Sequence, residues 1–440
     1  MEPFLKKFNR LEPAKQPEWL LPLRKAGQAR FAELGFPTLR DEDWRFTNVA
    51  PIAKLPFQPA REAIVNGAER KILDRSAFAN LSGTRLVFVN GFFSEMLSEI
   101  KPVSGGARVE SLSAALSNPA VRDALVEKHL GKYAFTADNA FAALNQAFFS
   151  DGAFIFVPPG VEIAGPVQLI YISSAKKSGE TIQPRNLIIA GANSKLTVVE
   201  SYLSTGNAAY FTNAVTEIVA GDNSTLEHVK IQDEAADAYH LATIAGEFGR
   251  ASRASLHSFA LGAKLSRTNI RAKLAGEGLE CVLNGLYLTR GNQLSDHHMV
   301  VEHAQPNCAS HEYFNGILDD KSKGVFHGRI YVHPIAQKTD AKQTNKNLLL
   351  SDDATADTKP QLEIYADDVK CTHGATIGQL NDESIFYLRA RGIGMDNARR
   401  MLIHAFAGEI IERVKCSPVR EELDKLVWNR LEAKLHLAEQ

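Results

Sequence analysis

The sequence has little cysteine, almost no net charge and no long hydrophobic run. Its 440 residues include four cysteines, and 50 basic side chains against 51 acidic ones leave a formal net charge of −1. Nucleic-acid-binding chains usually carry a basic excess, so this balance argues against that class of function. No apolar run approaches the ~20 residues that cross a bilayer, which argues against a membrane protein.

The cysteines are too far apart for a disulfide framework. Cys281, Cys308, Cys371 and Cys416 are separated by 27, 63 and 45 residues, and no CxxC pair occurs. We therefore expect reduced thiols. The first nineteen residues contain three glutamates and no apolar core, which argues against a secretion signal or a transit peptide. The expected location is the cytoplasm.

Nucleotide-binding motifs are missing as well. The sequence contains no G-x-x-x-x-G-K-[ST] phosphate loop, and Gly392 and Gly394 are not followed by the third glycine of a dinucleotide fingerprint. We expect no nucleotide site in this chain. If its function uses ATP, another chain supplies the binding site.

The composition is that of a globular protein, and its texture divides the chain into three regions. Hydrophobic residues make up 45% and charged residues 23%, which are ordinary values. We place an N-terminal, mostly helical region at residues 1–150, a β-rich core at 151–375 and a C-terminal helical region at 376–440. Apolar periodicity predicts N-terminal helices at 17–34, 118–131 and 137–149, and a strand at 85–89.

The core region consists of short apolar runs separated by Gly, Asn, Asp and Ser. One turn repeats: GANSKL at 191–196 returns as GDNSTL at 221–226, and looser versions follow at 249–256 and 276–279. Spacings of 30, 28 and 27 residues are typical of repeat architectures. Each unit holds two or three short strands and no helix, so it can bury its apolar face only by stacking on its neighbours. We predict a parallel β-helix rather than a β-sandwich.

Helical periodicity returns after the core. It predicts helices at 382–391 and 396–414, the second capped by Asp396, and a third that begins at Ser417-Pro418. The expected apolar positions are Ala398, Leu402, Ala405 and Phe406 in the second helix, and Val419, Leu423, Leu426, Val427 and Leu431 in the third. These helices either cap the end of the solenoid or offer a docking site for a partner, and one role does not exclude the other.

The densest group of potential metal ligands is DHHMVVEHAQPNCASHE at 296–312. On a strand, His297 and His303 face one way and His298 and Glu302 the other. His297 and His303 would lie ~20 Å apart along one strand, too far to share a metal ion. The spacing also matches no zinc motif such as HExxH. We interpret these histidines as structural.

Three pairs of aspartates suggest a different class of function, that of a β-helix polysaccharide lyase or hydrolase. Such an enzyme could use Ca²⁺ and a helper Arg329 together with the pairs Asp319-Asp320, Asp352-Asp353 and Asp367-Asp368. Adjacent residues on a strand point to opposite faces, so each pair supplies at most one inward carboxylate. We favour the interpretation that these are solvated turn residues.

Cys371 and His373 form a third group. Two residues apart on a strand, they share a face, with Val369 beside them. A thiol next to an imidazole suits ligation of a soft metal or an Fe–S cluster and also suits a cysteine nucleophile; a buried inert cysteine is the alternative. Fe–S clusters usually need four ligands. Because no second cysteine lies close by, a cluster here would share ligands with another subunit.

One long stretch resembles a known family. Residues 325–380, from VFHGRIYVHPIAQKTD to YADDVKCTHGATIGQL, resemble the signature of the SufB/SufD proteins of the SUF iron–sulfur assembly system. FYLRARGI at 386–393 and AFFSDGAFIFVPPGV at 147–161 resemble that family too. The motif DEDWRFTN at 41–48 and the chain length are similar to the shorter of the family's two members.

The resemblance implies a fold and a function. The family fold is a right-handed parallel β-helix with helical regions at both ends. The chain would be a non-catalytic scaffold that pairs with SufB through the ends of the β-helices, while the ATPase SufC binds the C-terminal helices near 382–440. Cys371 and His373 match the family's interface residues, which would hold a transient iron–sulfur cluster shared with SufB. The resemblance leaves open a homodimer in isolation, the cluster type and any flavin site.

Overall fold

The computed structural model describes residues 18–435, apart from 57, 61–64, 66, 80, 135, 176 and 177. Residues 1–17, which include most of the segment used above for the expectation about targeting signals and the predicted helix start at residue 17, therefore lie outside the described residues. Within the described part, no helix has both the length and the apolar character needed to span a bilayer.

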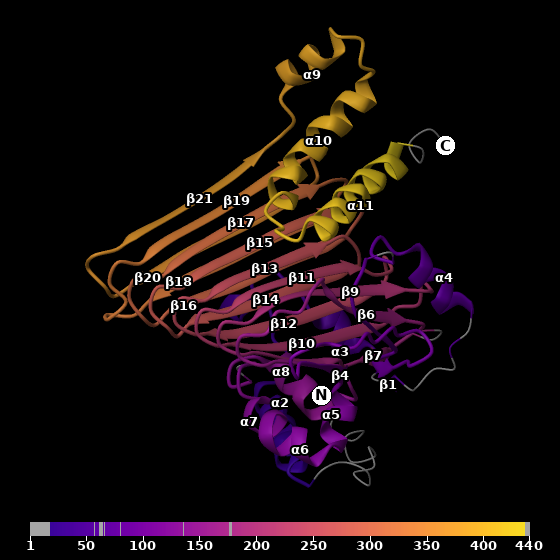
Figure 1. The fold of residues 1–440 in the computed structure, drawn as a ribbon. Helices are drawn as coiled ribbons and strands as arrows, with labels where there is room; N and C mark the ends of the chain where they lie inside the picture. Colours follow the sequence, from indigo (N-terminus) through magenta and orange to yellow (C-terminus); the bar gives the residue numbers. More distant parts are fainter. Residues whose placement is uncertain are drawn as a thin grey trace.

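The chain folds as a mainly β solenoid with helices before and after it (Figure 1). The N-terminal elements are α2 (Leu20–Leu34), η1 (Glu42–Trp44), α3 (Ala50–Lys54), β1 (Gln58–Pro59), α4 (Gly67–Arg75), β2 (Arg85–Val89), β3 (Phe92–Phe93), β4 (Arg108–Ser111), α5 (Leu112–Ser117), α6 (Pro119–Val121), the π-helical turn η2 (Arg122–Val126), α7 (Glu127–His129) and α8 (Ala140–Phe148). The C-terminal helices are α9 (Asp382–Arg389), α10 (Met395–Ile411) and α11 (Ser417–Leu435).

The solenoid strands alternate between two sheets, so that each full coil contributes one strand to each sheet. Sheet A contains β5 (Ala153–Val157), β7 (Glu180–Ile182), β8 (Arg185–Ala190), β10 (Phe211–Ala220), β12 (Tyr239–Phe248), β14 (Leu265–Leu274), β16 (Leu294–His303), β18 (Lys323–Val332) and β20 (Thr355–Ile364). Sheet B contains β6 (Val167–Ser173), β9 (Lys195–Ser204), β11 (Thr225–Asp233), β13 (Arg253–Ala260), β15 (Glu280–Thr289), β17 (Ala309–Leu318), β19 (Asp340–Leu349) and β21 (Lys370–Gly378).

Strands of successive coils pair in parallel and without slippage, as between β16 and β18 or between β17 and β19. The antiparallel pairs occur at the start of the solenoid, between β2 and β3 and between β4 and β5. The predicted parallel solenoid with flanking helices is confirmed.

The repeated turn of the sequence is a stacked corner of the solenoid. Asn193, Asn223 and Ala251 occupy equivalent places in three successive coils, each with a positive φ of 54–55°. The backbone N–H of each donates a 2.8 Å hydrogen bond to the carbonyl oxygen of a corner residue in the next coil. Asparagine tolerates this left-handed conformation better than most residues, which explains why G-x-N-S recurs in the sequence.

The space between the two sheets is the main core. Alternate residues of each strand point into it, and an apolar cluster runs through several coils, including Ile188, Ala214, Leu256, Ile270 and Met299. In β16, His297, Met299, Val301 and His303 are all buried, as the strand alternation predicts. The opposite face of sheet A is covered by the N-terminal helices, and α8 packs on β10 and on α2.

The N-terminal helices are held on the solenoid by a buried ion pair. Arg185 on β8 and Glu217 on β10 are fully buried, with Nη2 and Oε2 2.7 Å apart. Glu217 also accepts backbone N–H groups of Gly131, Tyr133 and Ala134 at 2.8–3.1 Å. One carboxylate therefore satisfies the turn that leads from α7 towards α8.

The C-terminal helices lie on the outer face of sheet B rather than over the end of the solenoid (Figure 1). The loop between α10 and α11 is held against sheet B, because the backbone N–H groups of Lys415 and Cys416 donate to the Glu227 carboxylate at 2.6 and 3.0 Å. Asn284 and Asn315 donate from the sheet to the carbonyl oxygens of Ile410 and Phe406, both at 3.0 Å. The interpretation of these helices as an end cap is wrong, because β21 stays uncovered.

The buried face of α10 also differs from the prediction. The helix begins after Gly394, not at an Asp396 cap. Its buried apolar residues are Ala398, Ile403, Ala407, Ile410 and Ile411, whereas Leu402 and Phe406 are half-buried and Ala405 is exposed. Contact with sheet B decides this face, and its strands are not neighbours of α10 in the sequence. In α11, the predicted Val419, Leu423, Val427 and Leu431 are buried.

Glu217→Gln should destabilise the protein strongly, because it leaves the Arg185 guanidinium buried without its charge partner. Removal of one partner of a buried ion pair typically costs about 3–5 kcal/mol. Denaturant unfolding, followed by hydrogen exchange of residues 131–134, measures the change. The matched control is Glu162→Gln, which removes the exposed Lys195–Glu162 pair and should change stability by less than ~0.5 kcal/mol. Equal effects of the two substitutions would contradict the anchoring role of Glu217.

Candidate functional site

The last coil of the solenoid is open on one side. Strands β18 and β19 have a coil above and below them, and most of their inward residues are buried. Strands β20 and β21 pair only with the coil below, and the residues of β21 are exposed except for the half-buried Cys371. Figure 1 shows these two strands at the edge of the sheets, with the helices to one side. The chain thus leaves a row of backbone groups and inward side chains without a covering layer.

Cys371 and His373 lie on the inward face of this open coil. They pair in register with the buried Ala341 and Gln343 of β19. Cys371 packs at the edge of an apolar cluster with Ile330, Val332, Ala336, Ala341 and Ala366. His373 points the same way as Cys371 but is exposed, because nothing within the described chain lies above it. The structure therefore brings the predicted pair together on one face.

Burial raises the pKa of the Cys371 thiol, and the nearby Asp340 carboxylate raises it further, although a backbone hydrogen bond from Ala341 opposes them. In the isolated chain the thiol is therefore mostly protonated at neutral pH. His373 is not among the groups that stabilise the thiolate. The pair can become a strong ligand set only when a cation, or a donor from another chain, favours the deprotonated sulfur.

The other three cysteines lie in different places. Cys281 and Cys308 are buried in the apolar core between the sheets, and burial raises the pKa of both thiols. Cys416 is half-buried just before α11, on the outer face of sheet B. None of these three accompanies Cys371 in the open coil.

The histidines of 296–312 are mostly structural. His297 hydrogen-bonds Ser258 at 3.0 Å and His303 hydrogen-bonds Ser310 at 2.8 Å, inside the solenoid. Burial lowers the pKa of His297 to about 3 and that of His303 to about 4, so both are neutral at pH 7. This agrees with the interpretation of these two residues as interior side chains.

His298 takes part in a cluster that sequence analysis missed. Its Nε2 and the Nδ1 of His327 each lie 3.9 Å from Oδ1 of Asp43, and the three ligand atoms lie within 4.8 Å of one another. The spacing alone resembles a metal site. Asp43 comes from the N-terminal region, so only the fold brings it beside two strands of sheet A.

The hydrogen bonds around this cluster argue against a cation. Arg267 approaches Nδ1 of His298 at 2.7 Å, and a guanidinium can only donate. Nδ1 is therefore an acceptor, the neutral ring keeps its proton on Nε2, and an N–H group rather than a lone pair faces the cluster centre. A metal ion needs the lone pair of that nitrogen. The arrangement therefore does not suit a metal ion.

Residues 43–47 also hold the N-terminal region against sheet A. The guanidinium of Arg267 lies 3.8 Å above the Trp44 ring and donates to the Asp43 carbonyl oxygen at 2.8 Å. Thr47 donates to the Asp296 carboxylate at 2.5 Å. The DEDWRFTN motif at 41–48 is thus a structural contact in this chain.

The aspartate pairs lie in or beside turns at the rim of the solenoid, not on strand faces. Asp320 accepts the backbone N–H of Gly291 at 2.8 Å, Asp353 lies 4.0 Å from Lys321, and Asp368 pairs with Lys338. The proposed helper Arg329 lies 3.7 Å from Glu363. These partners belong to solvated turns, and the polysaccharide-enzyme alternative gains no support.

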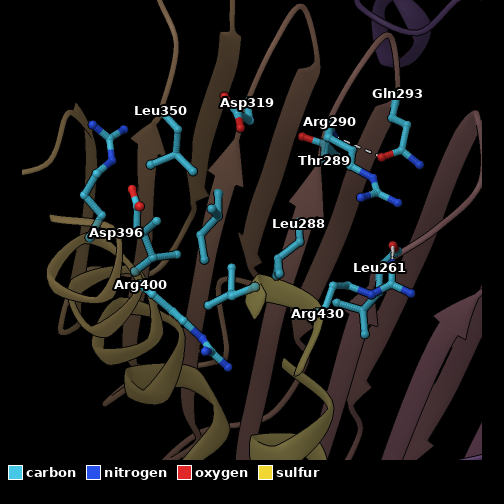
Figure 2. A pocket seen from close by; sticks show the side chains of 14 residues that line it. Leu261, Leu288, Thr289, Arg290, Gln293, Asp319, Leu350, Asp396, Arg400 and Arg430 are labelled. Carbon is cyan, nitrogen blue, oxygen red and sulfur yellow. Dashed lines mark hydrogen bonds between the residues drawn. The ribbon is translucent and has the colours of Figure 1, made fainter. Parts of the chain in front are cut away.

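A groove of about 220 Å³ separates part of the C-terminal helices from sheet B. Its apolar lining comes from both sides, with Leu288 from β15 and Leu261 directly after β13, and with Ile403 and Leu431 from the helices. Figure 2 shows Arg430 beside Leu261, Arg400 on the helix side of the groove, and Arg290 next to Thr289.

Comparison with known proteins shows which protein family this chain matches. The family model described as "SUF system FeS cluster assembly, SufBD core domain" matches residues 171–406. The family model described as "SufBD protein N-terminal region" matches residues 5–169. The chain is similar to the iron–sulfur cluster assembly protein SufD of Escherichia coli, with 32% identity over 400 residues and 90% of each chain covered. It is 33% identical over 414 residues to an iron–sulfur cluster assembly SufBD family protein of Synechocystis, covering 92% of this chain and 89% of the relative. SufD of Bacillus subtilis is 25% identical over 445 residues, with 97% of each chain covered.

Alkylation should separate the cysteines by exposure and by pH. With iodoacetamide, Cys371 and Cys416 should react well before the buried Cys281 and Cys308, and the rate at Cys371 should keep rising past pH 9. The reason is that the thiolate is the nucleophile and burial places the pKa of Cys371 above its ordinary value. Peptide mass spectrometry over pH 7–10 measures the rates. A rate at Cys371 that levels off below pH 8 would mean that the thiol is already ionised, contrary to this account.

Proposed function

The chain belongs to the SufB/SufD family and functions in SUF iron–sulfur cluster assembly, and from this premise we propose that it is a scaffold subunit whose open coil forms half of a cluster-building site. The observation that carries the proposal is the exposure of inward-facing Cys371 and His373 at the unpaired end of the solenoid. The E. coli and B. subtilis relatives bear the name SufD. The nascent cluster is the cargo of this site, not a resident cofactor.

The second half of the site comes from a paralogous solenoid, SufB. An open parallel coil offers unpaired N–H and C=O groups along β20 and β21, and such an edge readily pairs with another strand. Its exposed apolar side chains, Ile364, Tyr365 and Ile377, would be covered by that pairing. The partner would add the ligands that one thiol and one imidazole cannot supply, since a cluster normally takes four.

Cys371 would bind iron, or would accept a sulfane sulfur from a donor persulfide whose own thiolate leaves, and His373 would be a second ligand. Burial of the pair between two solenoids would exclude water. The raised pKa of the free thiol fits a site that does not hold metal until iron or a partner ligand arrives.

An ATPase partner, SufC, would dock on the C-terminal helices. Phe386 and Tyr387 on α9 are 74% and 55% exposed, and Met395 and Met401 on α10 are also exposed. Large apolar side chains grouped on two adjacent helices are typical of an interaction surface. The groove between these helices and sheet B leaves room for them to shift when the partner changes shape. ATP hydrolysis would belong to that partner and this chain would be non-catalytic.

Cys371→Ala and His373→Ala should each lower iron–sulfur enzyme activity in cells that depend on this chain. Loss of an outer-shell partner costs ~10–100-fold at many metal sites, and loss of a direct ligand should cost at least as much. Activity of an iron–sulfur enzyme in lysate, with protein abundance measured in parallel, tests this. Cys416→Ser is the matched control, since Cys416 is also half-buried but lies away from the open coil. Unimpaired activity in both alanine variants would remove these residues from the mechanism.

Phe386→Ser combined with Tyr387→Ser should weaken capture of an ABC-type ATPase when the tagged chain is purified from its native lysate. The substitutions remove exposed apolar area, so folding should be unaffected. Met96→Ser provides the control, because Met96 is 71% exposed in the N-terminal region. Equal ATPase recovery from the double variant and the control would place the docking surface elsewhere.

A further inference from the structure

Two buried polar residues lie directly below the open coil. Glu312 on β17 and Gln343 on β19 are 0% and 2% exposed and are paired in register one coil apart. Nε2 of Gln343 donates to Oε2 of Glu312 at 2.7 Å. The neighbouring inward residues are the buried Ser310 and Phe314 on β17 and Ala341 and Asn345 on β19.

Space for the pair is reserved by a glycine on the opposite sheet. A Cβ atom at Gly328 of β18 would lie 1.9 Å from Nε2 of Gln343 and 3.0 Å from Oε2 of Glu312. Any larger residue would displace the glutamine side chain. The interior at this level is therefore built around the Glu312–Gln343 pair rather than merely accommodating it.

Gln343 retains one unused acceptor. Among the described residues, its Oε1 atom has no hydrogen-bond partner although it is buried, and a buried polar atom without a partner costs ~1–3 kcal/mol. The amide NH₂ is engaged by Glu312, so the oxygen is the group left free. A buried polar atom that has no partner in a native structure calls for an explanation, and a role at a functional site is one such explanation.

The next residue in the same column is His373. It is paired in register with Gln343, and strands of adjacent coils lie ~4.8 Å apart. Side chains one coil apart hydrogen-bond elsewhere in this solenoid, as between Gln343 and Glu312 and between His327 and Gln361, both at 2.7 Å. The His373 ring is exposed, and an exposed ring can change rotamer on the picosecond-to-nanosecond scale.

We propose that Gln343, held in place by Glu312, is a positioning residue that accepts a hydrogen bond from the His373 ring and thereby selects its tautomer. A neutral imidazole has one N–H and one lone pair. If the N–H is directed down to Oε1 of Gln343, the lone pair of the other nitrogen is presented to the open coil, where a ligand lone pair is needed. This inference rests on the proposed function for the use of that lone pair, but not for the hydrogen bond itself.

Glu312 serves this arrangement as a neutral acceptor. Burial raises its pKa to about 8, although the hydrogen bond from Gln343 opposes the rise. At pH 7 the group is mainly protonated, so glutamine at position 312 preserves both its charge and its acceptor oxygen. Leucine at that position preserves only the volume.

The test measures the His373 tautomer in the full-length chain labelled with ¹⁵N-histidine. Ring nitrogen shifts are recorded at pH 7, where Glu312 is mainly protonated, with His373 assigned by the signal that His373→Asn removes. The native chain should show one dominant tautomer. Gln343→Met and Glu312→Leu should both shift the population towards a mixture, while Glu312→Gln should restore the native pattern. Thr344→Val, on the opposite face of β19, is the control.

The outcomes separate this inference from the proposed function. The tautomer readout needs no iron, sulfur or partner, so an unchanged tautomer in Gln343→Met and Glu312→Leu overturns the positioning role whatever His373→Ala does in cells. A shifted tautomer with cluster supply lowered ~10–100-fold supports it. A shifted tautomer with normal cluster supply overturns the functional link while leaving the Cys371 test unaffected. If Gln343→Met does not fold, Glu312→Leu with its Glu312→Gln rescue decides the question.

Discussion

The structure depends on parallel pairing of each coil with the next. Every inner strand has both edges satisfied, and the inward side chains of one coil are covered by those of its neighbours. This constraint cannot be met at the final coil of a single chain, because a parallel stack always ends with an unpaired edge. Pro360 in β20, which has no N–H to donate, is tolerated at such an edge. Cys371 and His373 are accessible because they lie on the last coil, which has no further coil stacked on it.

The two ends of the solenoid are treated differently. At the start, the antiparallel β3 and β4 stop the two sheets, and N-terminal helices cover the apolar face of the first strands. At the finish, the helices fold back along sheet B and leave the terminal strands uncovered. A helix pair placed over the last coil would have hidden the thiol and the imidazole. Their position on the side of the solenoid keeps the end free and still exposes Phe386 and Tyr387.

The N-terminal region also reaches the open end. Lys359 of β20 pairs with Glu42, 317 residues earlier in the chain, at 2.5 Å, and Trp44 stacks on Arg267 of β14, three coils below β20. Contacts of this kind connect residues 42–47 of the N-terminal region to the last coil on the outside of sheet A. Exposed ion pairs contribute little by themselves, so most of the adhesion comes from the buried contacts of Arg267, Asp296 and Thr47.

Local patterns in the sequence were sufficient to predict the solenoid and to place the candidate pair Cys371 and His373 on one strand face. The repeated G-x-N-S turn requires a left-handed corner residue, and strand alternation places Cys371 and His373 on one face whatever surrounds them. Only the tertiary structure decided which coil is left open, on which face the C-terminal helices lie, and that Asp43 meets His298. Only the tertiary structure likewise showed that Gln343 meets Glu312, because no motif in the sequence marks either residue. The two side chains meet because of the register between coils some thirty residues apart. That register is set by the whole stack of coils rather than by any short stretch of sequence.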